Sequence, residues 1–183
     1  MTSSHAPSAP GGPEALGAGV GAVHVGDASL PGRSAGGARL ALVCAKFNGA
    51  ITERLMAGAR HALEDHEVEL STVEVAWVPG AFELPVATAR FARSGGVDAV
   101  VALGAVIRGE TAHFDYVAGP CADGLQRVAL ETGVPVVFGV LTTEDVDQAL
   151  ARSGDDETNK GYEAVVTALE MTDLLDRLPP PKD

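Results

Sequence analysis

Three largely apolar runs of strand length constrain the fold of this chain more than any other feature. They cover residues 39–47 (RLALVCAKF), 97–107 (VDAVVALGAVI) and 134–141 (VPVVFGVL). Successive side chains of a strand point to opposite faces of its sheet, so a run that is apolar at successive positions is buried on both faces. Each run is followed by a segment with helical spacing. This alternation predicts a parallel sheet that is covered by helices on both sides.

The segments between these runs predict one further strand and several helices. Residues 68–78 (VELSTVEVAWV) are rich in β-formers and predict the fourth strand. Helical spacing is found in residues 51–66, 81–94, 114–132, 144–152 and 161–178. Pro120 is expected to kink the helix in which it lies or to delay its start. With right-handed crossovers, the order β-α-β-α-β-α-β-α-α predicts a three-layer α/β/α sandwich with a four-stranded parallel sheet.

The two ends of the chain differ in composition from this central part. We expect residues 1–19, rich in Ala, Gly, Pro and Ser, to be disordered because they have little apolar surface to bury. Residues 20–38 are expected to form an extended segment and an edge strand that pairs with a neighbour, such as another subunit. The domain itself is expected over residues 39–178, with a short tail at 179–183. The first residues have no basic region followed by an apolar block, so no secretory signal is expected.

Charge and composition exclude several classes of function. A net charge of −12 argues against general binding of nucleic acid or anionic membranes. No apolar stretch approaches the ~20 residues of a membrane-spanning helix. Cys44 and Cys121 are expected to be reduced thiols of a cytoplasmic protein. The histidines and cysteines have no compact spacing for a metal, and no Walker loop or GxGxxG motif occurs, so no metal site is expected.

A ligand site is expected beyond the carboxyl ends of the strands, as in other open α/β sheets. Of the loops at those ends, the one after residue 107 is the most informative. Gly109, Glu110 and Thr111 open a helix there, and the N–H groups and positive dipole end of a helix N-terminus suit a phosphate. His113 follows and can act as an acid or base near neutral pH. The alternative is that Thr111 only caps the helix and His113 is an ordinary surface residue.

The other loops have weaker signals. Phe47 is either a core residue or a stacking platform for a heterocycle. Glu83 either complements the dipole of the helix that it opens or accepts hydrogen bonds from a polyol. Arg108, Arg152 and Lys160 are the candidate cations for a phosphate, although basic residues at helix ends often only complement the dipole.

Taken together, these loops resemble the lumazine synthase family. The resemblance covers residues 39–175 and, more loosely, 23–38. Its motifs are KFN (Lys46–Asn48), VPGAFELP (Val78–Pro85), ALGAVIRGETAHFDYV (Ala102–Val117), PVVFGVLTTEDVDQALARSG (Pro135–Gly154) and NKGYEA (Asn159–Ala164). Each motif is modestly specific, but their joint order and spacing are highly specific.

The resemblance implies a flavodoxin-like sandwich and an activity in riboflavin biosynthesis. Members condense 5-amino-6-(D-ribitylamino)uracil with 3,4-dihydroxy-2-butanone 4-phosphate to 6,7-dimethyl-8-ribityllumazine, with release of phosphate and water and without metal or organic cofactor. The resemblance also implies pentamers, in some members assembled into an icosahedral shell of sixty subunits, with active sites between subunits. The short link at residues 155–158 resembles that of the shell-forming members.

The resemblance implies a role for each matching site residue. His113 is implied to be the catalytic proton-transfer residue. The implied ligands of the pyrimidine and its ribityl chain are Phe47, Asn48, Ala81, Phe82, Glu83, Val106, Ile107, Phe138 and Lys160. The implied phosphate ligands are Gly109, Glu110, Thr111 and Arg152. Phe138 and Arg152 are implied to reach in from the adjacent subunit.

Two other interpretations stay open at this point. One is a homologue repurposed to bind lumazine or flavin, or to form a shell. The intact His113, Arg152 and Lys160 argue against lost catalysis. The other is a flavodoxin-like binding module, which would need a phosphate loop after the first strand. Residues 47–49 (FNG) make a poor one.

Overall fold

A four-stranded, all-parallel sheet forms the middle layer of the computed structural model, which describes residues 37–179. The strands lie in the order β2-β1-β3-β4. Their bounds are β1 (Leu40–Ala45), β2 (Glu74–Val78), β3 (Ala99–Ile107) and β4 (Val136–Thr143). β1 and β3 are therefore central, and β2 and β4 are the edge strands of this sheet.

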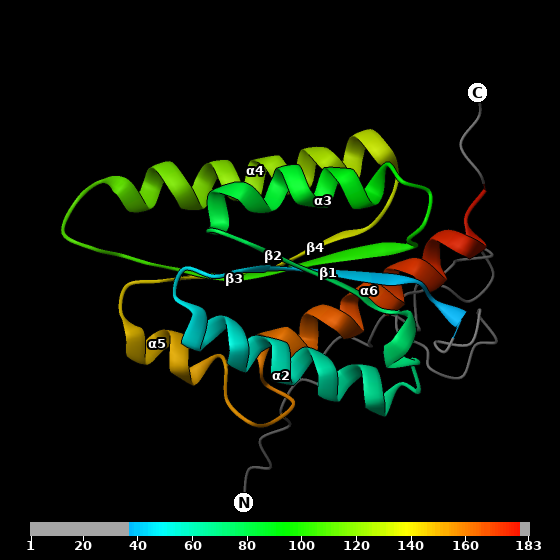
Figure 1. Ribbon diagram of the computed structural model, residues 1–183, viewed down its shortest axis with the longest axis horizontal. Helices are drawn as coiled ribbons and strands as arrows, with labels where there is room; N and C mark the ends of the chain where they lie inside the picture. The colour runs from blue at the N-terminus through cyan, green and yellow to red at the C-terminus, as the bar shows by residue number, and fades with distance from the viewer. Residues whose placement is uncertain (1–36, 180–183) are drawn as a thin grey trace, which may run out of the picture.

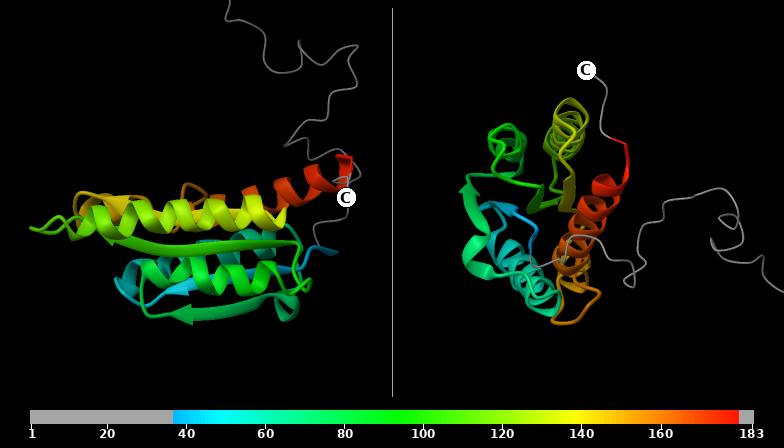
Figure 2. Two further views of the ribbon diagram at one scale, coloured as in Figure 1. Left: turned by 90° about the horizontal axis from the view of Figure 1, so that it is seen from above. Right: turned by 90° about the vertical axis from the view of Figure 1, so that its right-hand side faces the viewer.

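Helices cover both faces of the sheet, as Figures 1 and 2 show. The helices on one face are α3 (Leu84–Ala92) and α4 (His113–Thr132). Those on the other are α2 (Gly49–Asp65), α5 (Val146–Ala151) and α6 (Lys160–Arg177). The predicted three-layer α/β/α sandwich with a four-stranded parallel sheet is confirmed.

The alternation of side chains along β1 divides the core into two halves. Leu40, Leu42 and Cys44 pack with residues of α2 and α6, whereas Ala41 and Val43 pack with residues of α3 and α4. All of them are at most 1% exposed. Burial of a large apolar side chain contributes about 1.5–3 kcal/mol, so the buried leucines and valines on both faces of β1 and β3 stabilise both halves of the core.

The structure corrects three details of the predicted elements. The β-rich segment 68–78 is a strand only over β2, because a 3-10 turn occupies Leu70–Thr72. Hydrogen bonds from the hydroxyls of Ser71 (2.6 Å) and Thr72 (2.7 Å) to Glu69 favour this turn, since such local bonds compete with a strand ladder.

The other two details concern helices. The helix predicted at 81–94 begins as a 3-10 turn, Ala81–Glu83, before α3. Pro120 lies inside α4, so a late start of that helix is wrong.

Some expectations fall on residues that the structure does not describe. The expected disordered segment 1–19, nearly all of the extended segment 20–38 and most of the tail 179–183 lie outside residues 37–179. Within that range, no helix combines the length and the apolar character that crossing a membrane requires.

Both cysteines are free and buried. Burial raises the pKa of Cys44 to about 12 and that of Cys121 to about 11, because the thiolate loses its hydration. We predict that neither thiol reacts with a thiol-specific reagent at pH 8 while the protein is folded, and that both react once it is unfolded in guanidinium. Fast reaction of one thiol in the native protein would contradict the burial that the structure shows.

Gly161 allows α6 to lie against α2. A Cβ on Gly161 would lie 1.9 Å from the carbonyl oxygen of Leu55, so the helices would have to separate. We predict that Gly161→Ala lowers the free energy of unfolding by about 1–3 kcal/mol or more, as overpacking does. Urea unfolding measures this. The control is Gly49→Ala, where a Cβ meets nothing within 4 Å and the change should stay within about 0.5 kcal/mol. Equal effects of the two substitutions would contradict the close crossing.

Candidate functional site

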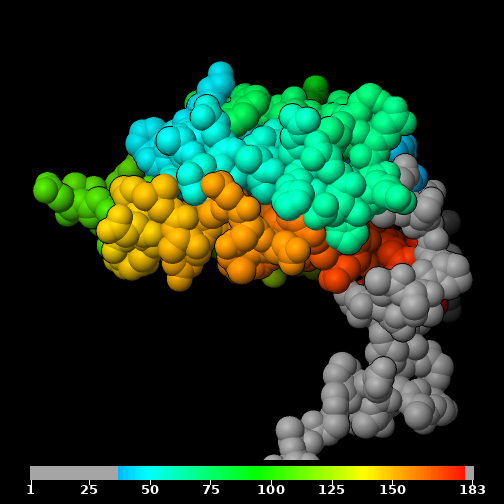
Figure 3. Space-filling model, turned by 90° about the horizontal axis from the view of Figure 1, so that it is seen from below, coloured from blue at the N-terminus to red at the C-terminus, as the bar shows by residue number. Residues whose placement is uncertain are grey.

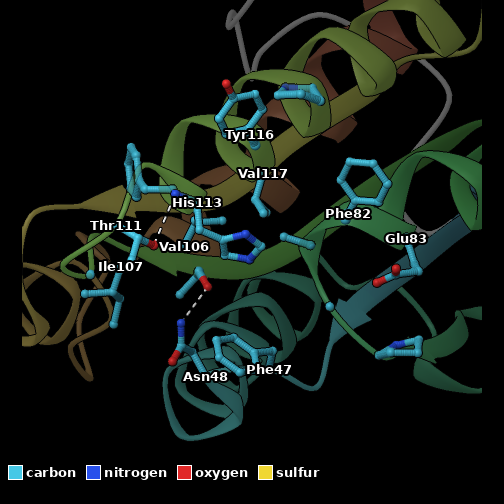
Figure 4. A pocket seen from close by; sticks show the side chains of 17 residues that line it. Phe47, Asn48, Phe82, Glu83, Val106, Ile107, Thr111, His113, Tyr116 and Val117 are labelled. Atoms are coloured by element: carbon cyan, nitrogen blue, oxygen red, sulfur yellow. Dashed lines mark hydrogen bonds between the residues drawn. The ribbon is translucent and has the colours of Figure 1, made fainter.

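A cavity of about 1020 Å³ opens beyond the carboxyl ends of β1, β2 and β3, where the sequence predicts a site (Figure 4). Its wall is formed by the loops after these strands and the first turns of α4. Aromatic side chains from different elements line it, namely Phe47, Phe82, Phe114 and Tyr116. A cavity of this size and character can hold a heterocycle with a polar substituent.

The β1–α2 loop presents Phe47 to the cavity. Phe47 is 72% exposed, so the interpretation of this residue as ordinary core is wrong. Its backbone N–H donates to the carbonyl of Pro79 at 3.0 Å. The next residue, Asn48, adopts the left-handed conformation (φ 57°), and its Nδ2 donates to the carbonyl of Ala105 at 2.9 Å. These bonds fix the loop to the ends of the neighbouring strands, and Figure 4 shows the one that Asn48 donates.

The β2–α3 loop contributes Ala81, Phe82 and Glu83 to the lining. Phe82 is 60% exposed. Glu83 is the N-cap residue of α3, but its side chain accepts no capping hydrogen bond from the helix. Its carboxylate extends over Gly80, where a Cβ would lie only 3.3 Å from Oε2. The carboxylate is therefore available to accept hydrogen bonds from the hydroxyls of a ligand.

The end of β3 and the β3–α4 loop form the opposite wall. Val106, Ile107, Gly109, Thr111 and His113 line the cavity. The backbone N–H of His113 donates to Thr111 Oγ1 at 3.4 Å. The N-cap residue of α4 is Ala112 and no side chain caps the helix, so the alternative that Thr111 only caps the helix is wrong. The His113 ring points toward the middle of the cavity, where it could exchange a proton with a ligand (Figure 4).

Glu110 lies in the same loop but is exposed and does not line this cavity. The loop projects beyond the rest of the domain (Figures 1 and 3). Glu110 can therefore help to bind a phosphate, as predicted, only if this loop meets another molecule at the site.

Arg108 is not available to a ligand as a spare cation. Its Nε lies 2.8 Å from Glu144 Oε2, and its Nη1 lies 3.3 Å from Asp115 Oδ1. The guanidinium also lies 4.0 Å from the centre of the Phe114 ring. The hydrogen bond that Arg108 donates to the Glu144 carboxylate is the main cause of the raised pKa of Arg108. Arg108 thus joins the first turn of α4 to the β4–α5 loop.

The remaining predicted cations lie in a second hollow of about 300 Å³ on the edge strand β4. Phe138, Arg152 and Lys160 line it. Lys160 Nζ lies 2.6 Å from Glu163 Oε2, and Arg152 Nη1 donates to the carbonyl of Gln148 at 3.0 Å. No residue lines both hollows, and within residues 37–179 no Lys or Arg lines the large cavity. One chain therefore does not bring the predicted cations to the predicted phosphate loop.

Several lining residues were missed by sequence reasoning. Among them are Tyr116, Val117 and Pro120, which share one face of α4 with His113. Helical spacing of three, four and seven residues from His113 is the signal that could have found them. Glu163, three residues after Lys160 on α6, could have been found as its counterion in the same way.

Metal ligation has no support in this part of the chain. Within residues 37–179, no group of three or more His, Cys, Asp or Glu side chains is arranged to hold a metal ion.

The fold and the cavity define a three-layer α/β domain with a hollow of small-molecule size at the carboxyl edge of its sheet. Residues 37–176 match the model of a family that is described as 6,7-dimethyl-8-ribityllumazine synthase. The chain belongs to this lumazine synthase family, which confirms the resemblance seen in the motifs. Membership points to riboflavin biosynthesis, to transferase activity on small molecules and to assembly into oligomers.

The left-handed conformation of Asn48 leads to a prediction that separates backbone strain from a lost hydrogen bond. Asn48→Gly loses the bond to Ala105, which costs about 1 kcal/mol. Asn48→Ala loses the same bond and also places a Cβ in a conformation that costs about 1–2 kcal/mol for an L-residue. We therefore expect thermal or urea unfolding to show that the wild type is the most stable, the Gly variant less stable and the Ala variant the least stable. An Ala variant as stable as the Gly variant would contradict the observed conformation.

Proposed function

We propose that this protein is a 6,7-dimethyl-8-ribityllumazine synthase of the cytoplasm. It condenses 5-amino-6-(D-ribitylamino)uracil with 3,4-dihydroxy-2-butanone 4-phosphate and releases phosphate and water. The observation that carries the proposal is the division of the site into two hollows. The large cavity has His113, aromatic walls and the proposed phosphate loop, but no Lys or Arg in its described lining. The smaller hollow on β4 has Arg152 and Lys160.

The large cavity fits the aminopyrimidine. Phe47 supplies an exposed ring for stacking on the heterocycle, with Asn48 beside it. Val106 and Ile107, at the end of β3, line the same cavity, and we assign hydrogen bonds with the ring edge to their backbone groups. Ala81 and Phe82 complete the wall, and the uncapped carboxylate of Glu83 accepts hydrogen bonds from the ribityl hydroxyls.

The sugar phosphate fits next to the pyrimidine, at the start of α4. Gly109 and Thr111 hold its phosphate together with the N-terminal end of the helix. Glu110, an exposed residue of the same loop, contributes to this site at the boundary with the adjacent copy. A dianion here needs positive charge, and Arg108 already pairs with two carboxylates. The balancing cation is therefore Arg152 of an adjacent copy, whose edge strand β4 also brings Phe138 to the ring and whose Lys160 completes the pocket.

The proposed chemistry uses these groups in turn. The amine attacks the ketone, and His113 moves the protons that imine formation and ring closure require. Arg152 and the α4 N-terminus stabilise the charge of the phosphate as it leaves. Holding the two substrates in register supplies much of the remaining acceleration.

Because each site takes residues from two copies, the working unit is a closed ring, for which we propose a pentamer. The short link at residues 155–158 favours further assembly of pentamers into a shell. Size-exclusion chromatography with light scattering distinguishes a pentamer from a shell of pentamers, since only the shell has a mass in the megadalton range.

The direct test is to mix the purified protein with both substrates without added metal, and to follow lumazine absorbance and phosphate release together. Coupled appearance of both products establishes the reaction. Tight binding of lumazine or riboflavin without turnover would instead show a homologue repurposed for binding.

His113→Ala tests the proton-transfer step. Loss of a positioned acid–base group typically slows a reaction by about 10²–10⁴-fold, and we expect kcat to fall within that range. The mass of the assembly should stay unchanged, because His113 is an exposed residue of the cavity wall and does not pack in either half of the core. Unchanged turnover would remove His113 from the mechanism.

Arg152→Ala tests the phosphate assignment. Loss of a charged hydrogen bond costs about 1.5–3 kcal/mol, so the Michaelis constant for the sugar phosphate should rise by about ten- to a hundredfold. The Michaelis constant for the pyrimidine should change little. An equal rise of both constants would contradict a role of Arg152 at the phosphate.

A further inference from the structure

Arg152, the proposed phosphate cation, and Lys160, which completes the same pocket, lie at the two ends of one short loop. Arg152 is the C-cap residue of α5 and Lys160 is the first residue of α6. The backbone N–H of Lys160 donates to the carbonyl of Arg152 at 2.9 Å, so the loop closes on itself. Figure 3 shows this segment packed against α2. The geometry of the loop therefore sets the relative positions of the backbone atoms from which the Arg152 and Lys160 side chains extend.

Asn159 holds this loop from the inside. Its side chain is only 1% exposed. Nδ2 donates to the carbonyl of Gly154 in the loop at 2.6 Å and to the carbonyl of Arg54 in α2 at 3.1 Å. Oδ1 accepts from the backbone N–H of Gly161 at 2.8 Å. One buried amide thus ties the loop, α2 and the start of α6 together.

Helix α2 is shaped to receive this amide. A Cβ on Gly58 would lie 2.3 Å from Oδ1 of Asn159, so only glycine leaves room for the amide in its present position. Arg54, one turn earlier, adds a second tie, because its Nε donates to the carbonyl of Ser153 at 2.8 Å. The loop is therefore fixed to α2 on both sides of Gly154.

We propose that Asn159 is a positioning residue for the phosphate-binding half of the site. It clamps the 152–160 loop to α2 and so sets the spacing of Arg152 and Lys160. Asn159 does not itself line the hollow that contains these cations, so it acts only through them. The inference rests on the proposed function for its kinetic readout, but phosphate binding tests it separately.

Two variants disturb the clamp in different ways. Asn159→Ser keeps a good N-cap oxygen for α6 but loses both amide donors. Gly58→Ala leaves Asn159 in place but pushes its side chain aside, while alanine itself favours the helix. The control is Thr172→Ala, which removes a buried hydrogen bond (2.9 Å, to the carbonyl of Ala168) toward the other end of α6, away from the loop. The melting temperature of each variant shows its structural cost.

We expect both clamp variants to raise the Michaelis constant for the sugar phosphate by about tenfold, and that for the pyrimidine by less than about twofold. The dissociation constant of inorganic phosphate, from calorimetry on the assembled protein, should rise by a similar factor. Thr172→Ala should lower the melting temperature and leave these constants unchanged.

A merely structural role of Asn159 predicts a different pattern. The clamp variants would then lower the melting temperature as the control does. Both Michaelis constants and the affinity for phosphate would stay at their wild-type values, and this result would overturn the proposal. A wild type that binds phosphate but forms no lumazine would refute the proposed reaction alone, and the phosphate affinities of the variants would still decide on the clamp. A wild type that does not bind phosphate overturns the clamp proposal as well.

Discussion

The burial of β1 and β3 on both faces is the constraint on which the rest of the structure depends. Strands that are apolar on both sides need a layer of helices above and below, and parallel strands need a crossover for every connection. All four carboxyl ends therefore meet at one edge of the sheet. The loops with Phe47, Glu83 and His113 lie side by side there, although long segments of sequence separate them.

Charge sets the second constraint. In a chain with a net charge of −12, a phosphate is bound only where local cations and N–H groups outweigh the surrounding carboxylates. Arg108, the nearest candidate in sequence to the phosphate loop, is held by Glu144 and Asp115 and braces the loop instead. Arg152 and Lys160 line the hollow on the edge strand β4. If a second copy docks against this strand, they can supply the positive charge that the phosphate needs. On this account, assembly is a condition of activity.

Much of the fold could be predicted from the sequence because its strongest signals are periodic. The runs at 39–47 and 97–107 have the apolar pattern of central strands, and they contain β1 and β3. The strand predicted at 68–78 was too long, because β-propensity does not show that hydroxyls of the segment bond locally to Glu69. Pro120 did not delay α4, since packing of the helix on the sheet outweighs the loss of one backbone donor.

The cavity could be predicted from the sequence, but the pairing of its charged residues could not. Glycine, histidine and aromatic residues at strand ends indicate the cavity, and most of them line it. A sequence does not show which cation is already paired. In the structure Arg108 and Lys160 each lie beside a glutamate, whereas the guanidinium of Arg152 donates to the carbonyl of Gln148. The role of Asn159 could not be predicted either, because its three partners are backbone atoms and one of them, the carbonyl of Arg54, lies far away in the sequence.

The central claim is that one catalytic site takes His113 from one copy and Arg152 from another, and mixing two inactive variants tests it most directly. His113→Ala and Arg152→Ala chains are co-expressed, the mixed assembly is purified, and its lumazine formation is compared with that of each parent. By random pairing, about a quarter of the interfaces combine an intact His113 with an intact Arg152, so the mixture should recover about a quarter of wild-type activity. A mixture no more active than the mean of its parents would contradict a site shared between copies.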